Sequence, residues 1–126
     1  MTDVEYLDLE DLLGLVRALG VGPVRDLGLL DSAAARPRSS ALGENAYPSL
    51  DLKAAALLHS IDQYHALVDG NKRLPWLAMV VFLDLNDHGP DLADDAAFDL
   101  GMDAAQGSVE VEEIAARLRI VPTGAS

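Results

Sequence analysis

The stretch His65-Ala66-Leu67-Val68-Asp69-Gly70-Asn71-Lys72-Arg73, followed by the apolar run from Leu74 to Leu83, is the most informative part of this chain. The order of residue types indicates the end of one helix, a short polar loop and the start of a second helix. A helix start has unpaired backbone N–H groups and the positive end of a dipole, so it attracts phosphate. Lys72 and Arg73 oppose that dipole unless an anion compensates them. The stretch therefore predicts a phosphate site.

Each polar residue of the stretch has a structural and a functional interpretation. Gly70-Asn71 suits a tight turn into a helix, and such a turn also exposes N–H groups that hold phosphate. Asp69 can cap the loop or bind magnesium through one oxygen. His65 is either a packed histidine or a general base for an incoming hydroxyl. Arg73 can hold a phosphate with two hydrogen bonds, whereas Lys72 acts as a point charge. The set points to transfer from a nucleotide.

Apolar spacing and capping residues predict an all-α fold of about six helices around a central apolar helix. The run from Leu74 to Leu83 is apolar on every face, so we expect its helix to be the central one. Residues 36–48 form the longest irregular stretch, and no strand-like alternation is sustained. We expect residues 1–121 to form a single domain and residues 122–126 a loose tail. The expected helices span about residues 9–19, 26–35, 50–65, 71–86, 92–105 and 111–118.

Composition excludes several classes of function. The net charge is −12 with nine Lys and Arg residues, which argues against a nucleic-acid binder because such a protein needs a basic face. The chain has no cysteine, so thiol chemistry is excluded and a reducing compartment is favoured. Residues 1–8 are acidic and do not form a signal peptide, and the longest apolar run is ten residues, too short for a bilayer. We therefore expect a cytoplasmic protein.

The stretch from His65 to Arg73 resembles the signature of the Fic/Doc family, in which a His is followed by an acid, a small residue, Asn, Gly or Lys, and Arg. Lys72 is the form seen in the Doc (death-on-curing) toxin branch. Adenylylating Fic enzymes have Gly there and a second Arg three residues after the first, where this chain has Trp76. The resemblance covers most of the chain and includes residues 28–32, 36–38, 47–48, 53–60 and 82–86.

The resemblance implies a compact Fic-like helical bundle and the toxin of a toxin–antitoxin pair, with a cognate antitoxin as partner. It implies a protein kinase that transfers the γ-phosphate of ATP to a threonine of an elongation factor Tu-like protein. His65 would be the catalytic base and Arg73 would stabilise the transferred phosphoryl group. Asp69 would bind Mg²⁺, and Gly70, Asn71, Lys72 and Arg73 would hold the nucleotide. Residues 36–48 would form a flap that docks a substrate segment by its backbone.

Two alternatives remain open. A Fic-type adenylyltransferase would use the same His65 base, but the hydroxyl it activates would attack the α-phosphate. Lys72 in place of Gly and the absence of the later Arg argue against this reading. A catalytically decayed protein-binding module has support only from Leu67 and Pro75, which depart from the usual family residues. Residues 40–45 also match the Ser-x-x-x-Glu-Asn pattern of the Fic inhibitory helix. They lie in a glycine-containing loop, so we interpret the match as coincidence and expect inhibition from the antitoxin chain.

Overall fold

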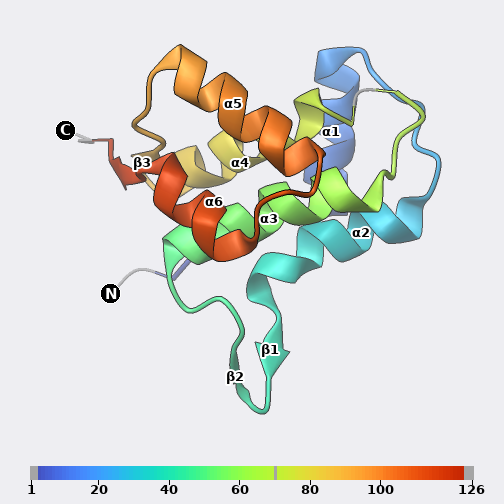
Figure 1. The fold of residues 1–126 in the computed structure, drawn as a ribbon. Coiled ribbons are helices and arrows are strands. Elements are labelled where there is room, and N and C mark those ends of the chain that lie inside the picture. Colours follow the sequence, from blue (N-terminus) through green and yellow to red (C-terminus); the bar gives the residue numbers. More distant parts are fainter. Residues whose placement is uncertain (1–2, 70, 124–126) are drawn as a thin grey trace.

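The computed structural model describes residues 3–69 and 71–123, and the chain in this part is mostly helical (Figure 1). The all-α fold that the sequence predicts is confirmed. None of the described helices has the length and apolar character needed to cross a bilayer. The helical elements are α1 (Leu9–Leu19), α2 (Leu27–Ala35), a short 3-10 helix η1 (Arg36–Arg38), α3 (Leu50–Tyr64), α4 (Arg73–Leu85), α5 (Asp94–Ala105) and α6 (Val111–Leu118).

The helix ends agree with the capping residues that the sequence predicts. Asp8 caps α1, and its side chain and that of Asp11 exchange hydrogen bonds with each other's backbone N–H groups. Gly20 ends α1 in the left-handed conformation with φ of 67°, a geometry in which glycine has no steric penalty. Ser49 accepts a hydrogen bond from the backbone N–H three residues on and caps α3. Local sequence therefore determines where these helices begin and end.

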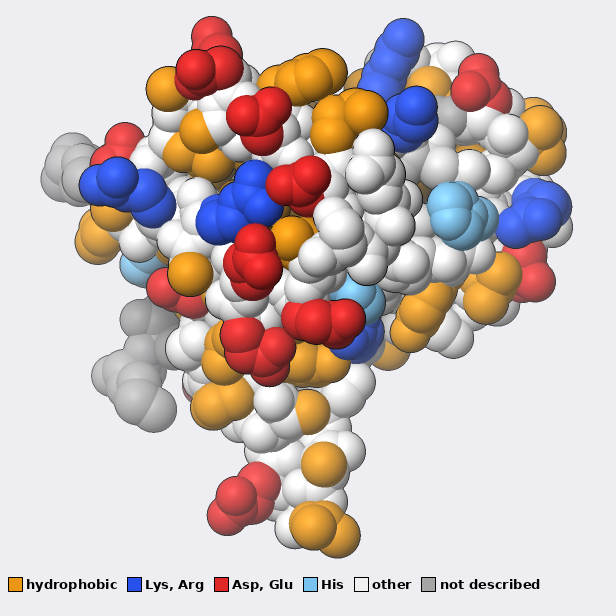
Figure 2. Space-filling model, viewed as in Figure 1, with side chains coloured by type: hydrophobic (Ala, Val, Ile, Leu, Met, Phe, Trp, Pro, Cys, Tyr) orange, Lys and Arg blue, Asp and Glu red, His pale blue; other side chains and the backbone are white. Residues whose placement is uncertain are grey.

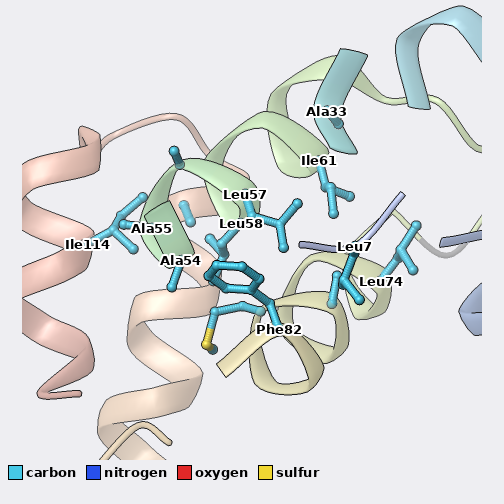
Figure 3. Close-up of a cluster of buried hydrophobic side chains, with 14 of the residues drawn as sticks. Leu7, Ala33, Ala54, Ala55, Leu57, Leu58, Ile61, Leu74, Phe82 and Ile114 are labelled. Atoms are coloured by element: carbon cyan, nitrogen blue, oxygen red, sulfur yellow. The ribbon is translucent and has the colours of Figure 1, made fainter. Parts of the chain in front are cut away.

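The helix at the centre of the fold is α3, and the prediction that the helix at Leu74 to Leu83 is central is wrong. Helix α3 packs against α2, η1, α4, α5 and α6. In Figure 3 its side chains face Phe82 and Leu74 of α4 on one side and Ile114 of α6 on another. Three consecutive alanines, 54–56, are fully buried in α3 and give the neighbouring helices little bulk to pack around.

Helix α4 is apolar all round without being covered all round. Its Ala78 and Phe82 are fully buried, but Val80 and Val81 are half-buried and Leu85 is 49% exposed. Hydrophobic composition measures the preference of a helix for burial, whereas its position depends on how many neighbours can approach it. The alanine-rich α3 admits more neighbours than α4, whose side chains are larger.

Residues 36–48 begin with η1 and continue into a hairpin that projects from the helical body (Figure 1). Strand β1 (Ser40–Ala41) pairs antiparallel with β2 (Glu44–Asn45), and Leu42 in the turn is fully exposed. The match to an inhibitory helix therefore lies on a hairpin, as its glycine indicated. Arg36 ties the hairpin base to the body, because it donates to the hydroxyl of Tyr47 at 2.9 Å and lies 2.7 Å from Nδ1 of His59 on α3.

A second pair of short strands lies where the chain approaches its C-terminal end. Strand β3 (His88–Gly89) pairs antiparallel with β4 (Val121–Pro122), and the backbone N–H of Thr123 donates to the carbonyl of Asp87 at 3.0 Å. Pro122, where the sequence predicts a loose tail to begin, is therefore part of β4. Residues 124–126 lie outside the described residues.

The position of α3 predicts unequal effects of two leucine truncations. Leu58→Ala on α3 should lower the free energy of unfolding by about 2 to 5 kcal/mol, because it removes a fully buried side chain from a packed interface. Leu85→Ala on α4 should cost about 1 kcal/mol or less, since that side chain is half in water. Urea denaturation followed by circular dichroism measures both. A larger loss for Leu85→Ala would contradict the central position of α3.

Candidate functional site

The end of α3, the following loop and the start of α4 face a single cavity of about 470 Å³. Five of the predicted site residues line it, so the structure brings together nearly the whole set that the sequence singles out. Gly70, the sixth, lies outside the described residues. One residue of α5, Ala105, closes another side of the cavity. The predicted residues that line the cavity are His65, Asp69, Asn71, Lys72 and Arg73.

His65 ends α3 in a left-handed backbone conformation, with φ and ψ both 50°. This conformation is uncommon for a residue with a side chain, so surrounding contacts must hold it. The guanidinium of Arg25 donates a hydrogen bond to the carbonyl oxygen of His65. The His65 side chain is exposed at the mouth of the loop. The residue is thus held through its backbone while its imidazole remains accessible.

The segment 22–26 holds the loop 65–69 by main-chain pairing. The N–H of Gly22 donates to the carbonyl of Asp69 at 2.9 Å, and the N–H of Val68 donates to the carbonyl of Pro23 at 3.0 Å. Val24 and Leu67 form an antiparallel bridge between these bonds. The sequence predicts only a turn near Pro23, and nothing local marks this role, because the pairing joins residues about 40 positions apart.

Asn71 closes the loop from inside. Its side-chain amide donates to the carbonyl of Leu67 at 2.6 Å, and its side-chain oxygen accepts the N–H of Leu67 at 3.1 Å. Leu67 is itself buried in the core at 2% exposure. The side chain of Asn71 therefore shapes the loop, in agreement with the structural interpretation of this residue.

The start of α4 combines cations with an uncapped helix end. Lys72 occupies the N-cap position and makes no side-chain cap hydrogen bond, and no acidic residue lies in the first turn. Lys72 and Arg73 are both exposed, and no carboxylate of the described chain forms an ion pair with either. Pro75 is buried within this first turn, where its missing N–H costs little. This end of the helix is chemically suited to an anion.

Asp62 is a site residue that sequence reasoning missed. It lies on α3 one helical turn before His65, lines the same cavity and is only 4% exposed. No side chain or backbone group of the described residues forms a hydrogen bond with its carboxyl group in this structure. Burial raises the pKa of this carboxyl to about 7. The available signal was an acid three residues before His65 within the apolar stripe of α3.

The chemistry of the cavity fits a nucleotide phosphate group with a divalent cation. Among the described residues no cluster of three or more His, Cys, Asp or Glu side chains could hold a metal. Mg²⁺ commonly takes one or two carboxylates and completes its shell with phosphate and water, so Asp69 beside an anion site is a suitable donor. The arrangement can therefore position phosphate near an exposed histidine base.

An apolar cavity of about 370 Å³ adjoins this site between α4 and α5, and Lys72 and Ala105 belong to both. Trp76 lies in its wall half-buried, opposite Phe98 and Met102. The face drawn in Figure 2 carries many acidic side chains over α5 and α6 with isolated cations among them. Positive charge at the site is therefore a local feature of an acidic molecule.

Comparison with known proteins agrees with this geometry. A family model described as the Fic/DOC family matches residues 6–83, which include the loop and most of α4. A protein named Toxin Doc from Mycolicibacterium smegmatis (strain ATCC 700084 / mc(2)155) is 48% identical over 118 residues. The match covers 90% of this chain and 91% of that protein.

The contact of Arg25 with the loop predicts a local effect of its removal. Arg25→Met should speed hydrogen exchange at the amide of Val68 by about tenfold, because loss of a charge-assisted hydrogen bond near 1.5 kcal/mol loosens the pairing. Arg17→Met on α1 is the matched control, since Arg17 is an exposed cation outside this contact. Exchange measured by NMR should change only in the first variant. Equal protection of Val68 in both variants would show that Arg25 does not hold the loop.

The buried carboxyl of Asp62 predicts a pH-dependent loss of stability. Its pKa is raised from 3.8 to about 7 on folding, so the folded state binds the proton more tightly. The protonated Asp62 therefore contributes its full share to the free energy of unfolding below about pH 4, and this share is lost as the pH rises from 4 to about 7. Asp62→Asn stays neutral, so its stability relative to the parent should increase between about pH 4 and pH 7 and level off above that. Asp84→Asn, at an exposed acid, should show no such trend in urea denaturation.

Proposed function

This chain belongs to the Fic/DOC family, and on that premise we propose that it is the toxin of a toxin–antitoxin pair and acts as a protein kinase. The proposed reaction transfers the γ-phosphate of ATP to a threonine of an elongation factor Tu-like protein. One observation carries the proposal: the uncapped start of α4, with Lys72 and Arg73, shares a cavity with His65. The toxin assignment is supported by the name of the relative that is 48% identical over 90% of this chain.

The residues divide the work that phosphoryl transfer requires. His65 takes the proton of the incoming hydroxyl, and its exposed imidazole leaves room for a protein substrate. Arg73 and the first N–H groups of α4 neutralise charge that develops on the transferred group. Asp69 would hold Mg²⁺, which neutralises phosphate charge when bound. The protein thus contributes positioning and charge stabilisation and forms no covalent bond to phosphorus.

The hairpin of β1 and β2 is the proposed docking place for the substrate segment. It stands out from the helical body, and its strands leave main-chain groups at an edge that an extended peptide can pair with. Arg36 anchors its base to α3, the helix that carries His65. A substrate held by the hairpin is therefore tied to the same rigid element as the base.

Two observations favour the kinase over the alternatives. The position where adenylylating Fic enzymes carry a second Arg is Trp76, which lines an apolar cavity and offers no charge to a further phosphate. The departures that support a decayed module are accommodated by the fold, because Leu67 is a core residue and Pro75 lies in the first turn of α4. Neither departure removes a group from the candidate site. A cognate antitoxin and a cytoplasmic location are part of the same proposal.

Labelled ATP tests the proposed reaction on a purified elongation factor Tu-like protein. Label at the γ-position should pass to a threonine, and label at the α-position should not. His65→Ala should lower the rate by about 10² to 10⁴ while the fold is retained, because it removes the base. Lys72→Gly should lose kinase activity. Transfer of the α-label by the parent would identify an adenylyltransferase, and transfer of neither label would favour the decayed module.

A further inference from the structure

The carboxyl of Asp62 has no use in the proposed reaction, yet it forms part of the wall of the site. It is 96% buried, and what remains of its surface opens into the cavity that contains Arg73. The last turn of α3 that carries it is braced by Gln63, whose side chain donates to the carbonyl of Ala104 at 2.9 Å. The position of Asp62 is therefore set by rigid packing.

The charged groups that share the cavity come from three places. His65 lies at the end of α3, Asp69 and Lys72 in the loop, and Arg73 at the start of α4. From α5 only Ala105 reaches the cavity, and no charged side chain of α1, α2, α5 or α6 lines it. Neither cation forms an ion pair with Asp62 in the described structure. No fully buried side-chain N or O atom of the described residues lacks a hydrogen-bond partner, so the Asp62 carboxyl, which forms no hydrogen bond with the protein, borders the cavity and is open to a ligand there.

A phosphate in this cavity interacts favourably with only one protonation state of Asp62. An ionised carboxylate would repel a polyanion, whereas the neutral acid is an O–H donor to it. Burial already raises the pKa of Asp62 to about 7, so the neutral form is available near neutral pH. A nearby phosphate raises the pKa further because like charges disfavour ionisation.

We propose that Asp62 is a phosphate-binding residue of this site, which donates its carboxylic O–H to a phosphate oxygen of the bound nucleotide. The inference rests on the proposed function to the extent that the cavity holds phosphate. No covalent step is involved: above neutral pH, one proton is taken up from solvent as the nucleotide enters and is released when it leaves. Asp62 thereby makes nucleotide affinity depend on pH.

Calorimetry of binding tests this role without any transfer reaction. ATP and, separately, inorganic pyrophosphate are titrated at about pH 7.5 in two buffers of different ionisation enthalpy, with and without Mg²⁺. The parent should take up more protons than Asp62→Asn, in which an N–H replaces the O–H and does not titrate. Proton uptake by the ligand itself is common to both proteins and cancels in the difference.

Affinity gives a second readout. Asp62→Asn should bind both ligands at least as tightly as the parent at about pH 8, whereas Asp62→Ala should bind about tenfold more weakly than the parent at pH 6 because the donor is gone. Asp84→Asn, at an exposed acid of α4, should match the parent throughout. Circular dichroism establishes that each variant is folded.

Three results would overturn the inference. Equal proton uptake by the parent and Asp62→Asn would exclude a titrating donor. Proton release by the parent, with loss of Mg²⁺-dependent binding in Asp62→Asn, would show that Asp62 is instead an ionised carboxylate that binds Mg²⁺. Absence of ATP and pyrophosphate binding would remove the phosphate site. The kinase proposal could fail while this one holds. Pyrophosphate binding with Asp62-dependent proton uptake, but without transfer of any label from ATP, would show this.

Discussion

The main-chain pairing between residues 22–26 and the loop 65–69 is the constraint on which the site depends. His65 occupies a left-handed conformation whose cost is of order 1 to 2 kcal/mol for an ordinary residue, and a free loop would leave it. The bond from Arg25 to its carbonyl and the bridge between Val24 and Leu67 retain it. They also set the path of the loop, so that α4 starts facing the cavity beside α3.

Helix α3 supports this arrangement because it is narrow and packs against most of the other helices. It also carries two buried charged residues with different surroundings. Lys53 donates to the carbonyl of Pro37 at 3.3 Å and lies 5.5 Å from the ring of Tyr6, so its contacts fasten the base of the hairpin. Asp62, near the other end, meets the site cavity instead. The same helix therefore links the proposed substrate flap to the proposed phosphate site.

Local and overall electrostatics have opposite signs in this protein. The net charge of −12 repels nucleotides at long range, but salt screens that repulsion beyond about 10 Å. Within the cavity, the first turn of α4, Lys72 and Arg73 act at contact distance, where screening is weak. Affinity for phosphate is thus a property of a few groups whose orientation the fold controls.

Local sequence was sufficient for much of the fold and of the site. Capping by Asp8 and Ser49 and the left-handed Gly20 depend on neighbours within a few positions, so both ends of α1 and the start of α3 could be predicted. The starts of α4 at Arg73 and α5 at Asp94 lie about two residues after the predicted ones. The loop from His65 to Arg73 is likewise contiguous, and its pattern indicated the family together with the residues that line the cavity.

Only tertiary structure decided which helix is central, what holds His65 and how Asp62 is buried. Apolar residues in α4 and α3 both favour burial, but the number of neighbours each helix accepts depends on packing of side chains from the whole chain. Arg25 contacts His65, which lies 40 positions later in the sequence, and helical or strand periodicity cannot predict a contact over that separation. Asp62 differs from the exposed acids of this chain only in its surroundings, because desolvation acts on a group through what encloses it.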